Sequence, residues 1–113
     1  MSEVVQVTDA SFEQEVLQSD KPVLVDFYAD SCGPCRAVAP FVAKLAEEFD
    51  GKVKFTKVDV AREMQTATKY QITGIPALMI IEGGEIKDQV LGARNDLLRK
   101  MVETAAGAAQ ESA

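Results

Sequence analysis

The sequence predicts an α/β fold built on a central mixed β-sheet, and three observations support this prediction. Strand-like and helix-like segments follow one another in the order β-α-β-α-β-α-β-β-α, which favours parallel strands with helices covering both faces of the sheet. The run VLVDFY at 23–28 is apolar on both faces, as is typical of a buried strand. Gly83-Gly84 between the last two strand-like segments predicts a hairpin, so antiparallel strands must also be present.

The first half of the chain is expected to form two strands and two helices. Residues 4–7, VVQV, predict a short strand, after which Thr8 or Asp9 can cap a helix. The apolar face of that helix comprises Phe12, Val16 and Leu17. After the strand at 23–28, apolar residues recur at steps of three and four, which predicts a helix that buries one stripe. This stripe comprises Cys35, Val38, Val42, Leu45 and Phe49.

The alternation continues in the middle of the chain. Residues 53–60, VKFTKVDV, alternate between apolar and polar side chains, as a half-buried strand does. Residues 62–70 suggest a shorter helix with Met64 and Ala67 directed inward. The stretch Gly74-Ile75-Pro76 then interrupts regular structure, because proline lacks an N–H and fixes its own backbone angle.

Two strands and one helix are expected to complete the fold. The apolar run ALMII at 77–81 and a strand within 85–91 form the predicted hairpin. Asn95 or Asp96 can cap the final helix. The apolar face of that helix comprises Leu97, Leu98, Met101, Val102 and Ala105. The methionines expected in the core are Met64, Met79 and Met101.

Length and composition indicate one domain. The chain has 113 residues, of which 47% are hydrophobic and 27% charged, and such a chain can bury one core without disulfides or a metal. We expect a single domain over 1–113, with a core from about 4 to 105. The small and polar end, 106–113, is expected to fray.

Charge and hydropathy exclude several function classes. The net charge of −6 and the lack of a Lys/Arg cluster argue against nucleic-acid binding. No apolar run approaches the roughly 20 residues of a membrane-spanning helix, so we expect no membrane partner. The beginning, MSEVVQVTDAS, lacks the basic and then apolar pattern of a secretory signal. A cytoplasmic location is therefore expected.

Both cysteines of the chain lie in one stretch of four residues, Cys32-Gly33-Pro34-Cys35. Gly33 and Pro34 follow a buried strand and open a helix, because proline is tolerated in a first turn. The helix N-terminus favours the thiolate of Cys32, and Cys35 lies one turn later on the same side. This arrangement predicts thiol–disulfide exchange, with Cys32 as the nucleophile, Cys35 as the resolving thiol and no cofactor.

Two cysteines can also serve as metal ligands or as a structural link. The chain has no His and no further cysteine, so a zinc site within one chain would need carboxylates as its other ligands. An iron–sulfur cluster shared by two chains is possible on ligand count. A purely structural disulfide closing so short a loop would stabilise the fold little. We expect no metal site.

Asp26 is a charged residue inside an otherwise apolar strand. Buried carboxylates are often held by neighbouring donors in a structural role. Alternatively, desolvation raises the pKa of such a carboxylate, so that it can exchange a proton near neutral pH. The strand leads into the cysteine turn, so Asp26 can accept the Cys35 proton directly or through water. Lys57, on the next strand, is its candidate partner, although an isolated lysine is more often a solvated surface residue.

These motifs together resemble the thioredoxin family. The resemblance extends from about Val4 to about Ala105, and it depends on residues spread along the whole chain. They are Asp26, Cys32-Gly33-Pro34-Cys35, Pro40, Lys57, Gly74-Ile75-Pro76, Gly84 and Gly92. A CxxC motif alone is a weak signal, whereas this combination is highly specific. A lowered cysteine pKa and a reducing potential are well-known properties of thioredoxins and are not predictions from this sequence.

The resemblance implies the thioredoxin fold, a central mixed sheet flanked by four helices, and a general protein-disulfide reductase. It implies that Cys32 attacks, Cys35 resolves, Asp26 handles the proton and Lys57 modulates Asp26. From the residues alone an X-Pro bond is usually trans, but the resemblance implies a cis Ile75-Pro76 bond. Substrate would pair with the Ile75 backbone, as in β-augmentation. The implied substrate-binding residues are Gly33, Pro34, Gly74, Ile75, Pro76 and Gly92.

The implied partners are disulfide-containing proteins and a thioredoxin reductase, linked to either NADPH or ferredoxin, and the protein is expected to be a monomer. An oxidase or isomerase with the same chemistry is a second hypothesis. The Gly-Pro dipeptide between the cysteines speaks against it. A third hypothesis is a subunit with the same fold that binds a partner without turnover.

The chain departs from the family pattern beside the first cysteine. Thioredoxins usually carry Trp at the positions of Ser31 and Tyr28, and Thr at that of Ala77, but this chain has no Trp. Loss of an exposed indole removes a contact surface of the kind that anchors interfaces. Ser31 can cap the helix or tolerate the turn. Alternatively, like Pro34, it tunes the thiolate, or its small size admits a particular partner.

Overall fold

The computed structural model describes residues 3–112 and contains one five-stranded mixed sheet. The strands are β1 (Val4–Gln6), β2 (Val23–Tyr28), β3 (Lys54–Asp59), β4 (Ala77–Glu82) and β5 (Glu85–Leu91). They lie in the order β1-β3-β2-β4-β5. Strands β1, β3 and β2 are parallel, whereas β4 is antiparallel to both β2 and β5. The predicted mixed sheet with its terminal hairpin is therefore confirmed.

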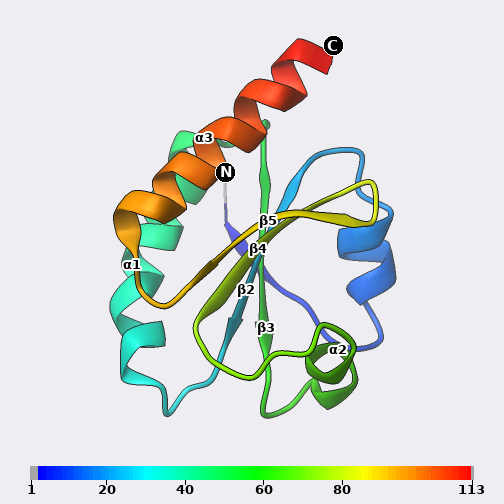
Figure 1. The fold of residues 1–113 in the computed structure, drawn as a ribbon. Helices are drawn as coiled ribbons and strands as arrows, with labels where there is room; N and C mark the ends of the chain where they lie inside the picture. Colours follow the sequence, from blue (N-terminus) through cyan, green and yellow to red (C-terminus); the bar gives the residue numbers. More distant parts are fainter. Residues whose placement is uncertain (1–2, 113) are drawn as a thin grey trace.

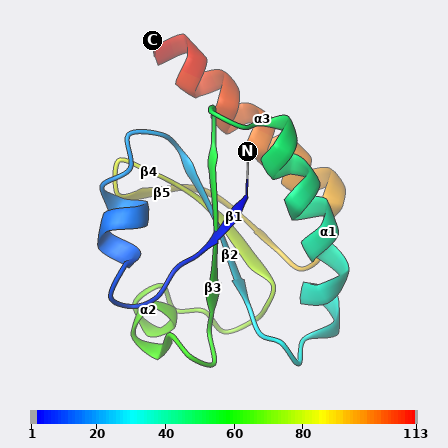
Figure 2. The ribbon, with the colours of Figure 1, turned by 180° about the vertical axis from the view of Figure 1, so that it is seen from behind.

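Four helical segments cover the two faces of the sheet. Helices α1 (Gly33–Glu48) and α3 (Asn95–Ser112) lie on one face, and η1 (Glu13–Leu17) and α2 (Met64–Lys69) lie on the other (Figures 1 and 2). The segment η1 is a single π-helical stretch. The predicted order of strands and helices is confirmed, and so is their arrangement in three layers.

The alternation of side chains along β2 builds a hydrophobic cluster on each face of the sheet. Leu24 belongs to the cluster under α1 and α3, while Val25 and Phe27 belong to the cluster under η1 and α2. Successive side chains of a strand point to opposite faces, so Asp26 has the same orientation as Leu24. Its carboxylate is therefore directed toward α1, the helix that has Cys32 as its N-cap and contains Cys35.

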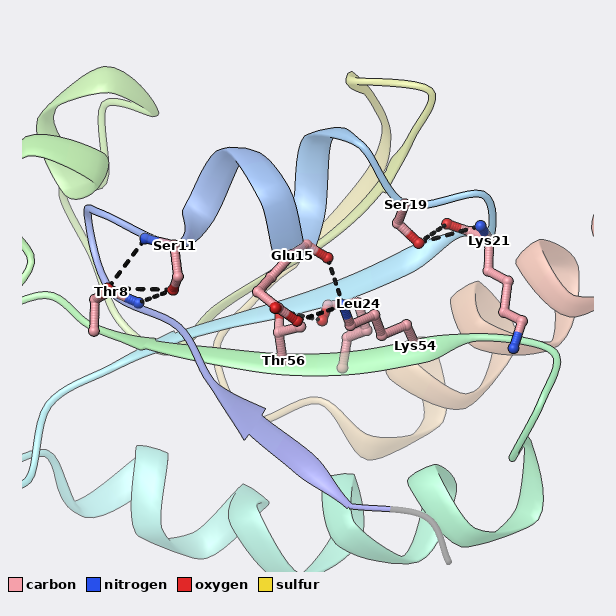
Figure 3. Close-up of polar contacts among 8 residues, drawn as sticks. All are labelled: Thr8, Ser11, Glu15, Ser19, Lys21, Leu24, Lys54 and Thr56. Atoms are coloured by element: carbon pink, nitrogen blue, oxygen red, sulfur yellow. Dashed lines mark hydrogen bonds and ion pairs between the residues drawn. The ribbon is translucent and has the colours of Figure 1, made fainter.

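Polar contacts hold η1 and the loops around it against the sheet (Figure 3). Lys54 Nζ donates to the Glu15 carbonyl oxygen at 2.8 Å and to Glu15 Oε1 at 2.7 Å. Thr8 Oγ1 accepts from the Ser11 N–H at 3.1 Å within the turn that precedes η1. The N-cap of η1 is Phe12, without a side-chain cap, so the prediction that Thr8 or Asp9 caps this helix is wrong. The contacts of Lys54 join η1 to β3.

Asp9 caps a different helix from the one that follows it in the sequence. Its Oδ1 accepts hydrogen bonds from the N–H of Thr66 at 2.9 Å and from Thr66 Oγ1 at 2.7 Å. In return, Glu63 Oε1 accepts from the Asp9 N–H at 2.8 Å. The result is a reciprocal cap on α2 in which the two partners are 54 residues apart in sequence.

Two of the predicted inward-facing side chains are exposed. Met64 is 66% exposed because it is the first residue of the short α2, whereas Thr66, held by Asp9, is buried. Leu97 is 38% exposed, since the buried stripe of α3 begins one residue later. That stripe comprises Leu98, Met101, Val102, Ala105 and Ala106. Met79 and Met101 are buried as predicted.

The end of the chain that is expected to fray, from 106 onward, lies in helix α3 as far as the structure describes it. Helix α3 continues to Ser112, and Ala106 is only 4% exposed. Alanine has the highest helix propensity, so the small residues of this end extend the helix. Within residues 3–112, the structure contains no helix with the length and hydropathy needed to cross a membrane.

The cap on α2 yields a stability prediction. Asp9→Ala is expected to lower the midpoint of thermal unfolding near pH 7, because three donors on α2 lose their acceptor. These hydrogen bonds lower the pKa of Asp9 below its ordinary value of 3.8. The stabilisation is therefore present above about pH 4 and disappears as pH falls through the lower folded pKa.

Thermal unfolding followed by circular dichroism at pH 7 and pH 2.5 measures this effect. Asp20→Ala is the charge-matched control, since Asp20 is exposed. The long-range cap is contradicted if Asp9→Ala and Asp20→Ala unfold at the same temperature at pH 7.

Candidate active site

The two cysteines lie where the central strand β2 passes into helix α1. Cys32 and Cys35 form a disulfide, with their Cα atoms 5.2 Å apart. Cys32 is the N-cap of α1, and its Sγ accepts a hydrogen bond from the Cys35 N–H at 3.1 Å. Pro34 is in the first turn, where its missing N–H leaves no intrahelical bond unmade. The predicted placement of Cys32 at a helix N-terminus is confirmed.

The two sulfurs differ in accessibility. Cys32 is half-buried, whereas Cys35 is only 4% exposed. The difference arises because Cys32 precedes the helix and Cys35 belongs to the stripe of α1 that faces the sheet. A substrate can therefore reach Cys32 more readily than Cys35.

The loop before β4 faces the exposed sulfur. The Ile75–Pro76 peptide bond is cis, as the resemblance implied, and the Ile75 carbonyl oxygen lies 3.9 Å from Cys32 Sγ. Gly92 supports the loop from the end of β5, because its N–H donates to the Pro76 carbonyl oxygen at 2.8 Å. Gly92 has a φ of +86°, a backbone conformation that other residues adopt only with strain.

The remaining predicted substrate-binding residues are arranged around this loop. Gly33, Pro34 and Gly74 are exposed, Ile75 and Gly92 are half-buried, and Pro76 is buried. A groove of about 450 Å³ runs along the loop and is lined partly by Gly74, Ile75, Pro76 and Gly92. The side chain of Leu91, 65% exposed, lines the same groove. The structure thus places Ile75 beside the Cys32 sulfur and brings Gly74, Ile75, Pro76 and Gly92 together along one groove.

Asp26 is buried beneath the disulfide. Its side chain is 5% exposed, and its Oδ1 has no hydrogen-bond partner among the described residues. Burial raises the pKa of Asp26 from 3.8 to about 6, an effect that the positive charge of Lys57 partly offsets. The alternative of a carboxylate held by neighbouring donors leaves this oxygen unexplained, because buried acceptors are normally hydrogen-bonded.

Lys57 is the neighbour of Asp26 on β3. The two residues are paired in the parallel register of β2 and β3, but no ion pair in the described part of the chain joins them. Lys57 is half-buried, and its Nζ lies 5.7 Å from the centre of the Tyr28 ring. A cavity of about 170 Å³ is lined by Asp26, Cys35, Lys57 and Tyr28, among others. This cavity connects Cys35 with the buried carboxylate.

Ser31 is exposed and is not the cap of α1, because Cys32 occupies that position. The interpretation of Ser31 as a helix cap is therefore wrong. The alternative interpretation, that Ser31 is a small polar residue accommodated in the turn, agrees with its exposure. Arg36, beside the pair, donates from Nη1 to the Asp30 carbonyl oxygen at 2.6 Å. Among the side chains that the structure describes, those of residues 3–107, no three of the His, Cys, Asp or Glu type form a group that can hold a metal ion.

The contacts of Tyr28 could not be predicted from the sequence. Tyr28 stands out there only as a replacement for Trp, whereas the structure shows its hydroxyl donating to Gln6 Oε1 at 3.1 Å. The only feature of the sequence that could have drawn attention to Tyr28 was an aromatic residue at the end of the central strand. Nothing in the sequence pointed to Gln6, because its position depends on β1 lying beside β3.

Comparisons with known proteins agree with this geometry. A family model described as Thioredoxin matches residues 3–104. "Thioredoxin 1" of Nostoc sp. is 54% identical over 93 residues, covering 82% of this chain and 87% of the relative. "Thioredoxin" of Pseudomonas aeruginosa is 46% identical over 94 residues, with coverage of 82% and 87%. A solved thioredoxin structure from Malassezia sympodialis matches with a TM-score of 0.88 at 30% identity, covering 94% of this chain and 93% of the other.

The raised pKa of Asp26 predicts a stability effect with a definite sign. Between about pH 4 and pH 6 the folded protein binds a proton at Asp26 that the unfolded chain has released, so ionisation of Asp26 destabilises the fold as pH rises. The full cost above pH 6 is on the order of 3 kcal/mol. Relative to the parent protein, Asp26→Asn should therefore gain free energy of unfolding by about this amount between pH 4 and pH 7.5.

Urea unfolding of the parent protein and of Asp26→Asn at the two pH values measures this gain. Asp59→Asn is the matched control, because Asp59 is equally buried but its Oδ1 accepts from the Ala61 N–H at 2.9 Å. An Asp26→Asn variant whose advantage does not change with pH would contradict the raised pKa.

Proposed function

The chain belongs to the thioredoxin family and is a thiol–disulfide oxidoreductase, and from this premise we propose that Cys32 is its attacking thiol and Cys35 its resolving thiol. One observation carries the assignment: Cys32 is the accessible N-cap whose sulfur accepts the Cys35 N–H, whereas Cys35 is buried. A helix N-terminus and a backbone donor both stabilise a thiolate. Cys32 is therefore both the more nucleophilic and the more accessible of the two cysteines.

The exchange proceeds in two steps that together transfer two electrons. The Cys32 thiolate of the reduced protein attacks one sulfur of a substrate disulfide, forms a mixed disulfide and releases the first substrate thiolate. The Cys35 thiolate then attacks Cys32 Sγ, forms the Cys32–Cys35 bond and releases the second substrate thiolate. The substrate is reduced and the dithiol becomes the disulfide seen in the structure.

We propose that Asp26 accepts the proton of Cys35 as that thiol attacks. The two residues line the same cavity of about 170 Å³, which exceeds the roughly 10–15 Å³ that a water molecule needs. A pKa of about 6 lets the carboxylate take up and release a proton near neutral pH. Lys57 modulates this step, because its charge favours the ionised form of Asp26.

The substrate segment is proposed to bind in extended form across the loop at the cis bond. Gly33, Pro34, Gly74, Ile75, Pro76 and Gly92 form the proposed contact surface. Support comes from the Ile75 carbonyl oxygen lying 3.9 Å from Cys32 Sγ, which places main-chain hydrogen-bonding groups beside the reacting atom. Pairing through the main chain tolerates many side chains and so suits a general reductase.

Membership of the family implies disulfide-containing substrates and a reductase as partners. We propose that this reductase is an NADPH- or ferredoxin-linked thioredoxin reductase and that the protein acts as a monomer. We also propose a cytoplasmic location. This is supported by the reducing character of the cytosol, which would keep the pair available as a dithiol.

The two cysteine roles predict different outcomes for two otherwise similar substitutions. Cys35→Ser should accumulate mixed disulfides with many proteins, because Cys32 still attacks but nothing resolves the product. Cys32→Ser should form none. Both should lose at least about 10³-fold in insulin-disulfide reduction with dithiothreitol, since the two thiols act as a unit.

Non-reducing gel electrophoresis after incubation with a mixture of disulfide proteins separates the two variants. Accumulation with Cys32→Ser in place of Cys35→Ser would reverse the assignment. Full biological activity of either variant in the cell, despite the lost insulin reduction, would show that catalysis is not the function and leave a binding role.

A second prediction concerns Ser31. We propose that the small side chain at this position helps to select the reductase partner. Ser31→Trp restores an aromatic surface beside Cys32 and is expected to change the KM for the physiological reductase by about tenfold, because aromatic residues anchor interfaces. Turnover with dithiothreitol should stay the same. Assays with NADPH- and ferredoxin-linked reductases measure both values, and unchanged KM values would eliminate the role of Ser31 in partner selection.

A further inference from the structure

Tyr28 connects three strands beside the buried carboxylate. It is the last residue of β2, its ring lies 5.7 Å from Lys57 Nζ, and its hydroxyl donates to Gln6 Oε1 at 3.1 Å. The strand register places Lys57 next to Asp26 on one side and next to Gln6 on the other. The hydroxyl of Tyr28 is therefore hydrogen-bonded to Gln6 of β1, while the ammonium group of Lys57 on β3 lies over the face of the ring.

The position of the Lys57 ammonium group is otherwise weakly determined. The ion pairs in the described part of the chain do not include Lys57, and a lysine side chain has four rotatable bonds that favour extension into water. An ammonium group within about 6 Å of an aromatic ring centre is attracted by the ring. Contact with Tyr28 therefore opposes the movement of Lys57 away from Asp26.

The other charged groups around this cluster already have partners or lie beyond it. Arg36, which lines the same cavity from α1, donates from Nη1 to the Asp30 carbonyl oxygen, and Asp59 accepts from the Ala61 N–H. Burial raises the pKa of the Tyr28 hydroxyl, and Asp59, Asp30 and Asp26 raise it further, so the tyrosine stays neutral near pH 7. Cys35 completes the cavity wall. Lys57 is the cation that acts on the Asp26 pKa.

We propose that Tyr28 is a positioning residue for the exchange reaction: its ring, fixed by the hydrogen bond to Gln6, holds Lys57 beside Asp26. This inference rests on the proposed role of Asp26 in taking up the Cys35 proton. Tyr28 touches neither substrate nor sulfur in this role. It acts through Lys57, by keeping a positive charge close enough to favour the carboxylate form.

The proposal predicts a shift in the titration of Asp26. In Tyr28→Leu the ammonium group is released, so the midpoint of the Asp26 titration should rise by at least about 0.5 pH unit. Lys57→Met should raise it at least as much. The double variant should titrate like Lys57→Met alone, because the ring acts only through the lysine. Tyr28→Phe keeps the ring but loses the bond to Gln6, so its shift should be smaller than that of Tyr28→Leu.

The measurement is an NMR titration of the Asp26 carboxyl carbon in the reduced, full-length protein. Lys69→Met is the matched control, since Lys69 Nζ lies 5.6 Å from the Tyr70 ring in a second lysine–tyrosine contact. It removes the same charge and should not move the Asp26 titration. If water entering beside Asp26 were the main effect of Tyr28→Leu, the midpoint would fall, and a fall or no change would overturn the proposal.

A kinetic experiment separates this proposal from the proposed proton transfer. Resolution of a Cys32-linked mixed disulfide is followed from pH 5 to pH 9 in the parent protein, in Asp26→Asn and in Tyr28→Leu. If Asp26→Asn resolves at the parental rate while Tyr28→Leu still raises the Asp26 midpoint, the proton role fails and the positioning of Lys57 stands. If Asp26→Asn is slow but the Tyr28→Leu midpoint is unmoved, the positioning fails and the proton role stands.

Discussion

The burial of β2 on both faces is the constraint on which the rest of the site depends. Strand β2 pairs with β3 on one side and β4 on the other, and its first five residues are buried. A strand held in this way is rigid, so the turn at its end starts α1 at a determined place. The same burial removes Asp26 from water and raises its pKa. One element thus sets both the geometry of the thiols and the acidity of the group beneath them.

The reactivity of the disulfide follows from an asymmetry that the start of α1 creates. Cys32 precedes the first helical residue and receives a backbone N–H, whereas Cys35 lies within the helix and faces the sheet. The fold places a loop with a cis peptide bond across from Cys32, and behind Cys35 a cavity that contains the Asp26 carboxylate in its wall. The loop and the buried carboxylate therefore lie next to different sulfurs, the loop beside Cys32 and the carboxylate in a cavity lined by Cys35.

Most of the fold could be predicted because the pattern of each element agrees with its burial. Apolar runs, the alternation at 53–60 and the Gly83-Gly84 turn located the five strands, and a period of three and four located the stripe of α1. The motif identified Cys32 and Cys35 from their spacing. The exceptions have physical causes. Met64 lies at the end of a helix only six residues long, so periodicity carries little information there. The small residues after Ala105 predict a frayed end, yet the same residues favour a helix when one side is buried.

The sequence by itself determined the reaction class, because a CxxC pair after an apolar strand must place one thiol at a helix start and the second a turn later. It also determined that Asp26 is buried, since a strand apolar on both faces leaves its only charged residue no access to water. Tertiary structure decided what surrounds these groups: the cap of Asp9 on α2, the loop at Ile75, and the contact of Tyr28 with Gln6 and Lys57. These contacts join residues far apart in sequence, and only the order β1-β3-β2-β4-β5 determines which strands become neighbours.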